Sequence, residues 1–140
     1  MILESAQMLC TVLDGLGLDA PYRPTHAKHP CTLWAGESLS NWRWLRRLAL
    51  ALGGEHEYRF APEREHSSIG VVRGLPEPPI VDRGLTAFAQ AMPDRYMVPG
   101  DAVAAYRAFY IGEKARFAGW TRRRRPRWFA EGVRRAGGVS

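Results

Sequence analysis

The chain has 140 residues, of which 46% are hydrophobic and 11% aromatic, enough for one folded domain with a core of its own. Its longest apolar runs, such as residues 48–52, fall far short of the roughly 20 residues that cross a bilayer, and two cysteines cannot build a disulfide framework. We therefore expect a cytoplasmic protein without a signal segment, and its net charge of +6 favours an anionic partner.

The first predicted helix covers residues 2–14. Its apolar side chains recur at i, i+4, i+7 and i+11, which is one helical stripe: Ile2, Ala6, Leu9 and Leu13. Gly15 and Gly17 supply the stop signal. No Ser, Thr, Asp or Asn stands before this helix to accept its leading N–H groups, so either this end frays or Met1 was once internal to a longer helix.

Three prolines indicate an irregular segment from Leu18 to Gly36. We expect Thr25, His26, His29 and Cys31 to lie on this loop. The histidines there can donate hydrogen bonds to phosphates or to nearby backbone, or cap the helix that follows. His26, His29 and Cys31 are also possible metal ligands, but no second short-spaced pair completes a zinc site, so no metal is predicted.

Ser38 or Ser40 can cap the second predicted helix. Its buried face carries Leu39, Trp42, Leu45, Leu48 and Leu52. Off that face lie three arginines that are candidates for contacting nucleic acid: Arg43, Arg46 and Arg47. We expect Gly53-Gly54 to end or bend this helix, with one further turn possible over residues 55–60.

A short helix is predicted from His66 to Leu75, and residues 75–80 should be an extended connector because its prolines fix φ and lack N–H donors. Asp101 is the expected N-cap of a long helix that runs to about Trp120. One face of that helix carries Val103, Tyr106, Tyr110 and Phe117, and a neighbouring stripe carries Arg107 and Lys114.

These elements predict an all-α protein, because no alternating apolar pattern is long enough to make a sheet. We expect a compact single-domain helical bundle with long loops and a basic C-terminal segment. Residues 1–120 would form the helical domain, and residues 121–140 a basic extension packed on it or trailing from it. The sequence leaves the oligomeric state open.

Positive charge is concentrated toward the C-terminus. Residues 1–104 carry ten basic and twelve acidic side chains (net −2), whereas residues 105–140 carry ten and two (net +8). Five guanidinium groups that can each bind a phosphate lie within six residues: Arg122, Arg123, Arg124, Arg125 and Arg127. Trp128 and Phe129 can stack on bases or pack back onto the domain. The alternative for the whole segment is a solvated basic tail.

Two residues are candidates for catalysis. Glu4 has apolar neighbours on the first helix, and partial burial there would raise its pKa and suit it to general acid–base chemistry, whereas a solvent-exposed carboxylate would have no such role. Lys114 follows Arg107 and Tyr110 on its helix and can bind phosphate, or form a Schiff base if desolvated. Its alternative is an ordinary helix lysine whose amine reaches solvent.

The chain resembles a set of phage and bacterial proteins that share a series of short motifs. The matching residues are Met1-Ile2-Leu3-Glu4-Ser5-Ala6-Gln7-Met8-Leu9, Thr-His-x-x-His-Pro at 25–30, Trp34, Glu37-Ser38, Asn41-Trp42-x-Trp44-Leu45, Ala-Met-Pro-Asp at 91–94, Tyr106-Arg107-x-x-Tyr110-x-x-x-Lys114, Trp120-Thr121 and Pro126-x-Trp128. The resemblance covers nearly the whole chain and implies no particular activity.

A more distant resemblance is to the phage pyrimidine-dimer DNA glycosylases, also called endonuclease V, which are small all-helical enzymes. Glu4 would match their catalytic glutamate, and residues 125–129 would match their Arg-Pro-x-Trp-aromatic segment close to DNA. The resemblance implies a DNA-binding protein of glycosylase and AP-lyase type, acting without a cofactor on a damaged or modified base in double-stranded DNA. A flipped base would be held near His26, His29 and Trp34.

In that family the α-amine of the mature N-terminus is the nucleophile that forms an imine with the sugar. The phage and bacterial proteins of the closer resemblance begin before this helix, so we expect a shortened chain without its catalytic N-terminus, and Lys114 is the alternative nucleophile. Two other functions stay open: a non-catalytic nucleic-acid-binding module that uses the arginine-rich C-terminus, and a protein-interaction subunit with a disordered basic tail.

Overall fold

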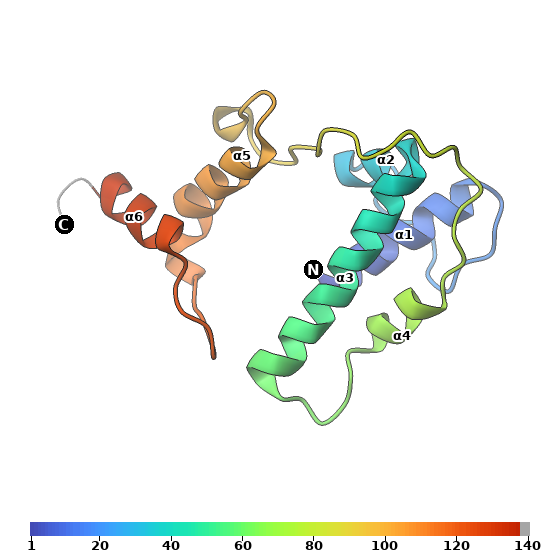
Figure 1. Cartoon of the computed structure of the whole chain (residues 1–140), viewed down its shortest axis with the longest axis horizontal. Coiled ribbons are helices and arrows are strands. Elements are labelled where there is room, and N and C mark those ends of the chain that lie inside the picture. Colours follow the sequence, from blue (N-terminus) through green and yellow to red (C-terminus); the bar gives the residue numbers. More distant parts are fainter. Residues whose placement is uncertain (138–140) are drawn as a thin grey trace. The chain divides into compact units, whose positions relative to one another are not determined.

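The computed structural model describes residues 1–137, and within that range the chain has six α-helices, two 3₁₀ turns and one π-helical turn but no strand (Figure 1). The predicted all-α class is therefore confirmed. None of the helices in the described range has the length and apolar character needed to span a membrane. The chain folds as two compact units, unit 1 over Met1–Ala89 and unit 2 over Gln90–Ser140. The division predicted at residue 120 stays a prediction.

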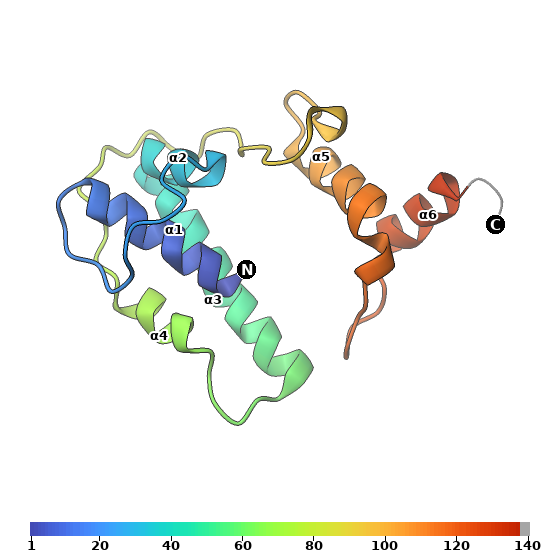
Figure 2. The same ribbon diagram turned by 180° about the vertical axis from the view of Figure 1, so that it is seen from behind.

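Unit 1 is built from four helices: α1 (Ile2–Gly15), α2 (Pro30–Glu37), α3 (Leu39–Phe60) and α4 (Ser67–Gly74). α1 packs against the other three and crosses α3, as the two opposite views show (Figures 1 and 2). Leu9 and Leu13 from α1, Trp42 from α3 and Val72 from α4 are all fully buried. The apolar stripe predicted for residues 2–14 thus forms one side of this core.

Helix α2 corrects the prediction that residues 18–36 are irregular. Pro30 occupies the first helical position, where its missing N–H has no intrahelical partner to lose and its fixed φ already suits a helix. His29 caps the helix, because its Nδ1 accepts a hydrogen bond from the Cys31 N–H at 3.1 Å. Thr25, His26 and His29 therefore precede the helix, as predicted, but Cys31 lies in its first turn.

Helix α3 continues through Gly53-Gly54, which corrects the prediction of a break there. Gly53 is buried because Ile69 of α4 packs directly on it, and a methyl group at Gly53 would lie 2.5 Å from the Ile69 Cδ1. The glycine thus permits close packing of α3 on α4. The helix ends at Phe60, and its C-cap residue Ala61 has a left-handed backbone with φ +41°.

Side-chain hydrogen bonds hold the extended segment 75–89 against α2 and α3. Asn41, fully buried, donates its Nδ2 to the Trp34 carbonyl at 2.8 Å and to the Thr86 Oγ1 at 2.7 Å. Its Oδ1 accepts a hydrogen bond from the Thr86 N–H at 3.0 Å. One amide therefore joins α2, α3 and the extended segment. We call residues 75–89 the strap.

Asp82 of the strap caps α3 in place of the two predicted serines. Ser38 holds the N-cap position, but its hydroxyl donates to the Gly84 carbonyl at 2.8 Å instead of accepting from the helix. The Asp82 Oδ1 accepts from the Ser40 N–H at 3.2 Å and from the Ser40 hydroxyl at 2.6 Å. A carboxylate distant in sequence thus satisfies a leading N–H group of α3.

Unit 2 begins with the 3₁₀ turn η1 (Asp94–Tyr96) and continues through α5 (Ala102–Phe109), the π-helical turn η2 (Tyr110–Lys114), the 3₁₀ turn η3 (Ala115–Phe117) and α6 (Arg127–Ala136). The predicted cap is confirmed, because the Asp101 Oδ1 accepts from the Ala104 N–H at 3.0 Å. The long helix predicted to reach Trp120 instead changes to π geometry at Tyr110 and ends at Phe117.

Phe129 of α6 is the centre of the core of unit 2, with 2% of its surface exposed. Three aromatic rings surround it, with centroids 4.7 to 6.0 Å away: Trp120, Tyr110 and Trp128. Gly132 lets α6 approach η2, because a methyl group there would collide with the Ile111 side chain. Aromatic packing therefore carries most of this small core.

Candidate nucleic-acid interface

The two units differ sharply in charge. Unit 1 carries nine basic and ten acidic side chains (net −1), whereas unit 2 carries eleven basic and four acidic side chains (net +7). A polyanion is attracted to a concentrated positive charge because each neutralised phosphate releases condensed counterions. Unit 2 is therefore the part of the chain suited to bind nucleic acid.

The predicted arginine cluster lies at the surface of unit 2. All four residues of Arg122–Arg125 are exposed in the turn before α6, and Arg122 has a left-handed backbone with φ +58°. Arg127 opens α6 with its side chain 92% exposed and pairs with Glu131 at 3.2 Å. Two further arginines at the end of α6, Arg134 and Arg135, are exposed as well. Sequence reasoning counted these two in the basic segment but did not single them out.

Several of the cations lie over aromatic rings. The Arg107 guanidinium carbon is 5.1 Å from the Trp128 ring centroid. Arg125 lies 5.6 Å from the centroid of Phe129 and 5.9 Å from that of Trp120. Distances of this size are typical of cation–π contacts, which also leave the outer N–H groups of an arginine available. The arginines thus contribute both to packing and to surface charge.

Phe129 does not form a stacking tip, because it is buried; of the two alternatives for this ring, packing back onto the protein is the one observed. Trp128 is only partly buried and meets Tyr110 edge-on, with ring centroids 6.1 Å apart. Tyr106 and Tyr110 are 40% and 37% exposed on one face of α5 and η2. We call Tyr106, Arg107, Tyr110 and Trp128 the aromatic patch.

The two catalytic candidates are carried by different units. Lys114 is exposed at the end of η2, with its Nζ 5.6 Å from the Phe109 ring centroid. Glu4 lies on α1 with its side chain 53% exposed, and the Met1 amino group is 2.6 Å from its Oε2. Both side chains stay accessible to solvent. Acid–base chemistry at Glu4 and Schiff-base formation at Lys114 were each expected only if the side chain was buried.

Of the two alternatives for Glu4, the solvent-exposed carboxylate is the one observed, and its pKa is lowered. The hydrogen bond from the Met1 amino group lowers the pKa of Glu4, and a backbone hydrogen bond and the charge of His26 act in the same direction. His26 has a left-handed backbone with φ +57°, and its ring lies 6.2 Å from that of His29, edge-on. The carboxylate is thus held in its charged form beside an amine and an imidazole.

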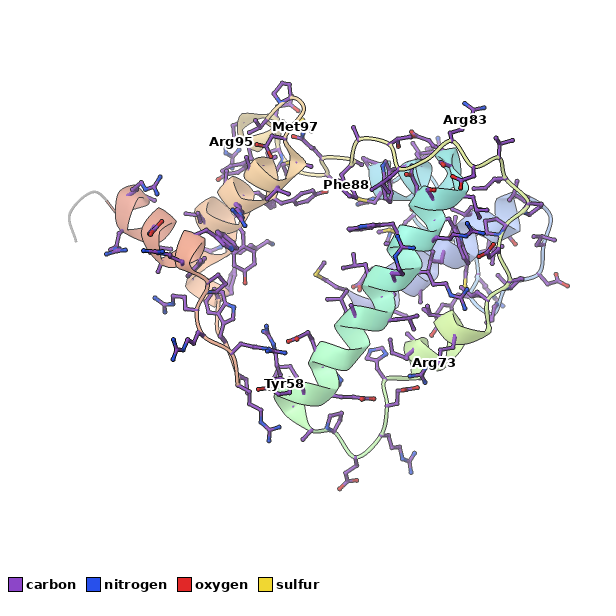
Figure 3. All side chains as sticks on the ribbon, viewed as in Figure 1. Tyr58, Arg73, Arg83, Phe88, Arg95 and Met97 are labelled. Atoms are coloured by element: carbon purple, nitrogen blue, oxygen red, sulfur yellow. The ribbon has the colours of Figure 1, made fainter. Side chains whose placement is uncertain are left out.

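Trp34 belongs to the core of unit 1. It is 5% exposed, and its ring packs against Trp44 at 5.7 Å and against Phe88 at 5.2 Å. Figure 3 labels Phe88 on the strap. Its indole N–H donates to the Thr86 carbonyl at 3.3 Å. No face of this ring is left for a base, so its predicted role in holding nucleic acid is corrected to a structural one.

Two of the three arginines on α3 are committed to structural contacts. Arg43 binds Glu77 with two hydrogen bonds of 2.8 and 2.7 Å, which raise the pKa of Arg43 and lower that of Glu77. Arg46 donates to the Arg73 carbonyl at 3.0 Å and lies 6.0 Å from the Trp42 ring centroid. Arg47 is exposed. All three arginines lie off the buried face of α3, as predicted, but Arg43 and Arg46 are engaged in contacts within unit 1.

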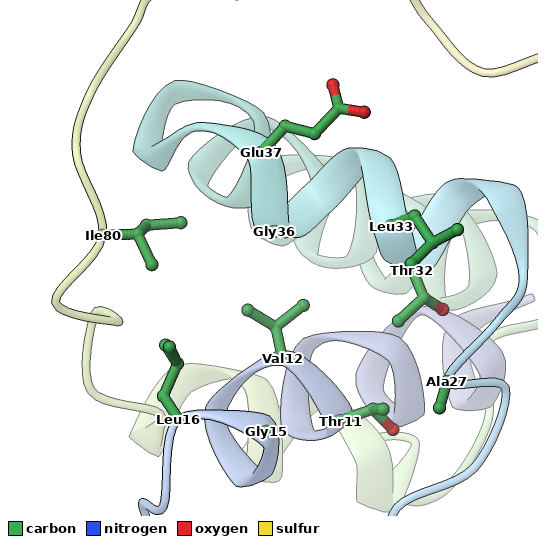
Figure 4. A pocket seen from close by; sticks show the side chains of 10 residues that line it. All are labelled: Thr11, Val12, Gly15, Leu16, Ala27, Thr32, Leu33, Gly36, Glu37 and Ile80. Atoms are coloured by element: carbon green, nitrogen blue, oxygen red, sulfur yellow. The ribbon is translucent and has the colours of Figure 1, made fainter.

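A shallow groove of about 360 Å³ lies between α1, α2 and the strap (Figure 4). Val12, Leu16, Leu33 and Ile80 make its lining mainly apolar, and Glu37 lies at its side. None of the residues predicted to act in catalysis or binding lines it. Over residues 1–137, no three His, Cys, Asp or Glu side chains lie close enough together to hold a metal ion.

Comparison with known proteins identifies no relative. No protein-family model matches the chain, and neither a curated protein nor a solved structure is significantly similar to it.

Proposed function

We propose that the protein binds nucleic acid through the basic surface of unit 2. The observation that carries the proposal is the net charge of +7 on this unit, displayed by exposed arginines before and along α6. Arginine binds phosphate oxygens with paired hydrogen bonds, so Arg122–Arg125 suit a phosphate backbone better than a single small anion. Duplex DNA, the partner expected from the sequence, is one such backbone.

The position of the arginines beside aromatic rings supports this function over a tail that only aids solubility. A solvated tail requires charge and no fixed neighbours. Here Arg107 and Arg125 lie over Trp128, Trp120 and Phe129. These contacts hold the positive charge against a folded surface, as a binding site requires.

The salt dependence of binding tests the proposal. A fluorescently labelled duplex should bind with an affinity that falls as salt rises, and changing Arg122–Arg125 to alanine should weaken binding. The slope of log affinity against log salt should become shallower by up to about 3.6, because each phosphate contact contributes about 0.9.

A matched control removes the same charge from unit 1. The variant R23A/R64A/R73A/R83A changes four exposed arginines of that unit, none of them a predicted binding residue, and should leave the slope unchanged. An unchanged slope in the unit 2 variant would rule out this surface. An equal change in both variants would show that only total charge matters.

The second candidate function is DNA glycosylase and AP-lyase activity on a damaged or modified base. The supporting observation is the Glu4 carboxylate 2.6 Å from the Met1 amino group, with His26 contributing to its charge environment. In such a reaction an amine attacks the sugar C1′, the glycosidic bond breaks and the base leaves with a proton, and opening of the sugar ring then gives the imine; a carboxylate assists ring opening and proton transfer.

Borohydride trapping on an abasic duplex tests this candidate. A covalent adduct should form, and mass mapping should place it on either Met1 or Lys114. The E4Q variant should lose most of an adduct on Met1, whose amino group lies 2.6 Å from the Glu4 Oε2, whereas E63Q, which changes an exposed glutamate elsewhere in unit 1, should not. Absence of any adduct, also with an extended N-terminus, would remove the candidate.

A further inference from the structure

We infer that the aromatic patch of unit 2 binds single-stranded nucleic acid, by stacking its rings on unpaired bases while neighbouring arginines bind the phosphates. The inference rests on the proposed function and names the class of nucleic acid that this surface selects. It differs from the expectation of duplex DNA drawn from the sequence.

The patch presents flat rings to solvent. Tyr106 and Tyr110 lie four residues apart, and each keeps more than a third of its surface exposed. Trp128 of α6 stands edge-on to Tyr110 at 6.1 Å, with an interplanar angle of 71°. Aromatic side chains at a basic surface are the usual stacking platforms for unpaired bases.

The rings are supported from beneath. Buried Phe129 contacts Tyr110 at 5.8 Å and Trp128 at 6.0 Å between ring centroids. The π-helical turn begins at Tyr110, and such turns occur often at functional sites. Tyr110 and Trp128 are therefore held by the core of unit 2, and the Tyr106 hydroxyl accepts a hydrogen bond from the Ala91 N–H at 3.1 Å.

Cations accompany the rings closely enough for one nucleotide to meet both. Arg107 lies 5.1 Å from the Trp128 ring centroid, and it belongs to the same helix as Tyr106. A nucleotide carries a flat base close to its phosphate, so an aromatic ring close to a guanidinium can contact the base while the guanidinium binds the phosphate. With a net charge of +7 on the unit, this complementarity favours a polyanion over an apolar protein surface as the occupant.

Base stacking separates single strands from duplexes. In a duplex the faces of each base are covered by the neighbouring base pairs, and a protein reaches only the base edges and the phosphates. A duplex would therefore contact the arginines and leave the tyrosine rings unused. A single strand can use both.

The experiment compares labelled probes of equal phosphate number by fluorescence anisotropy at one salt concentration. The probes are a single DNA strand of about 16 nucleotides, the RNA strand of the same sequence, a hairpin duplex, and a DNA strand whose bases are replaced by abasic sites. The natural single strands should bind about 5- to 100-fold tighter than the duplex and the base-free strand, as expected for stacking one or more bases. Comparison of the single-stranded DNA and RNA probes shows which of the two nucleic acids binds more tightly.

A pair of matched variants locates the effect. Y110L should weaken binding of the natural single strand by about 5- to 100-fold and leave the base-free strand unchanged, because leucine keeps apolar volume against Phe129 but has no ring to stack. Y58L, the same change at an exposed tyrosine of α3 in unit 1, should alter neither.

Equal affinity for all four probes would overturn the inference and leave phosphate binding by unit 2 intact. Absence of binding to every probe would overturn the proposed function, and the inference with it. If Y110L fails to fold by circular dichroism, the comparison of probes on the unaltered chain decides the question.

Discussion

Replacing Asn41 with alanine should release the strap from α2 and α3. The change removes three hydrogen bonds, to the Trp34 carbonyl, the Thr86 hydroxyl and the Thr86 N–H, all between 2.7 and 3.0 Å. A net contribution of about 1 kcal/mol for each gives a loss of roughly 3 kcal/mol in the free energy of unfolding. The loss is this large because Asn41 is fully buried and water cannot replace it.

Urea titration followed by tryptophan fluorescence measures the effect, since Trp34 and Trp44 pack beside the strap through Phe88. T86V, which removes the hydroxyl and with it the hydrogen bonds to Asn41 and Glu37, should cost about 1–2 kcal/mol. The double variant N41A/T86V should lose about 1 kcal/mol less than the sum of the two single changes, because these residues share a bond. A loss below about 1 kcal/mol for N41A, or full additivity, would refute this account of the strap.

Two further predictions concern α3. G53A should destabilise the protein by about 1 kcal/mol, because the collision with buried Ile69 outweighs the gain in helix propensity. G54A has open space around it and should stabilise the protein by up to about 1 kcal/mol. Thermal unfolding of the two variants measures both effects, and equal effects would contradict the packing of α3 on α4. Hydrogen bonds from the Ser40 hydroxyl and the Gly84 N–H lower the pKa of Asp82 from 3.8 to about 2, so its stabilising effect should be complete above pH 4 and lost as the pH falls to about 2. The unfolding midpoint of D82N, measured in urea from pH 6 to pH 2, should lie below that of the unaltered protein and approach it at the acid end; a constant gap would contradict the assignment.

Apolar periodicity predicted α1 and α3, a short helix was predicted where α4 lies, and capping chemistry predicted the role of Asp101. The stripe over residues 103–117 also predicted one long helix, but the structure has α5, η2 and η3 there. α2 was missed because Pro30 was interpreted as a helix breaker, although proline is favoured at a first helical position. The break expected at Gly53 was wrong because a glycine pair can mark either a stop or a close helix contact, and only the position of Ile69 distinguishes them.

The candidate site was harder to predict, because exposure depends on partners far along the chain. Trp34 was expected at the surface, but its neighbour Phe88 lies 54 residues later in the strap. The same limit applies to Asn41, whose partner Thr86 lies 45 residues away. The charge contrast between the two ends of the chain does not depend on contacts between distant residues. It could therefore be counted from the sequence, and the two units show the same contrast.

The arginines that lie over rings have a consequence for the thermodynamics of binding. A free arginine on a surface loses about 0.5–1.5 kcal/mol of conformational entropy when a ligand immobilises it. Arg107 and Arg125 are already held against Trp128 and Phe129 in the folded chain, so much of that loss belongs to folding and not to association. If unit 2 binds a flexible strand as proposed, this preorganisation lowers the entropic cost of that binding.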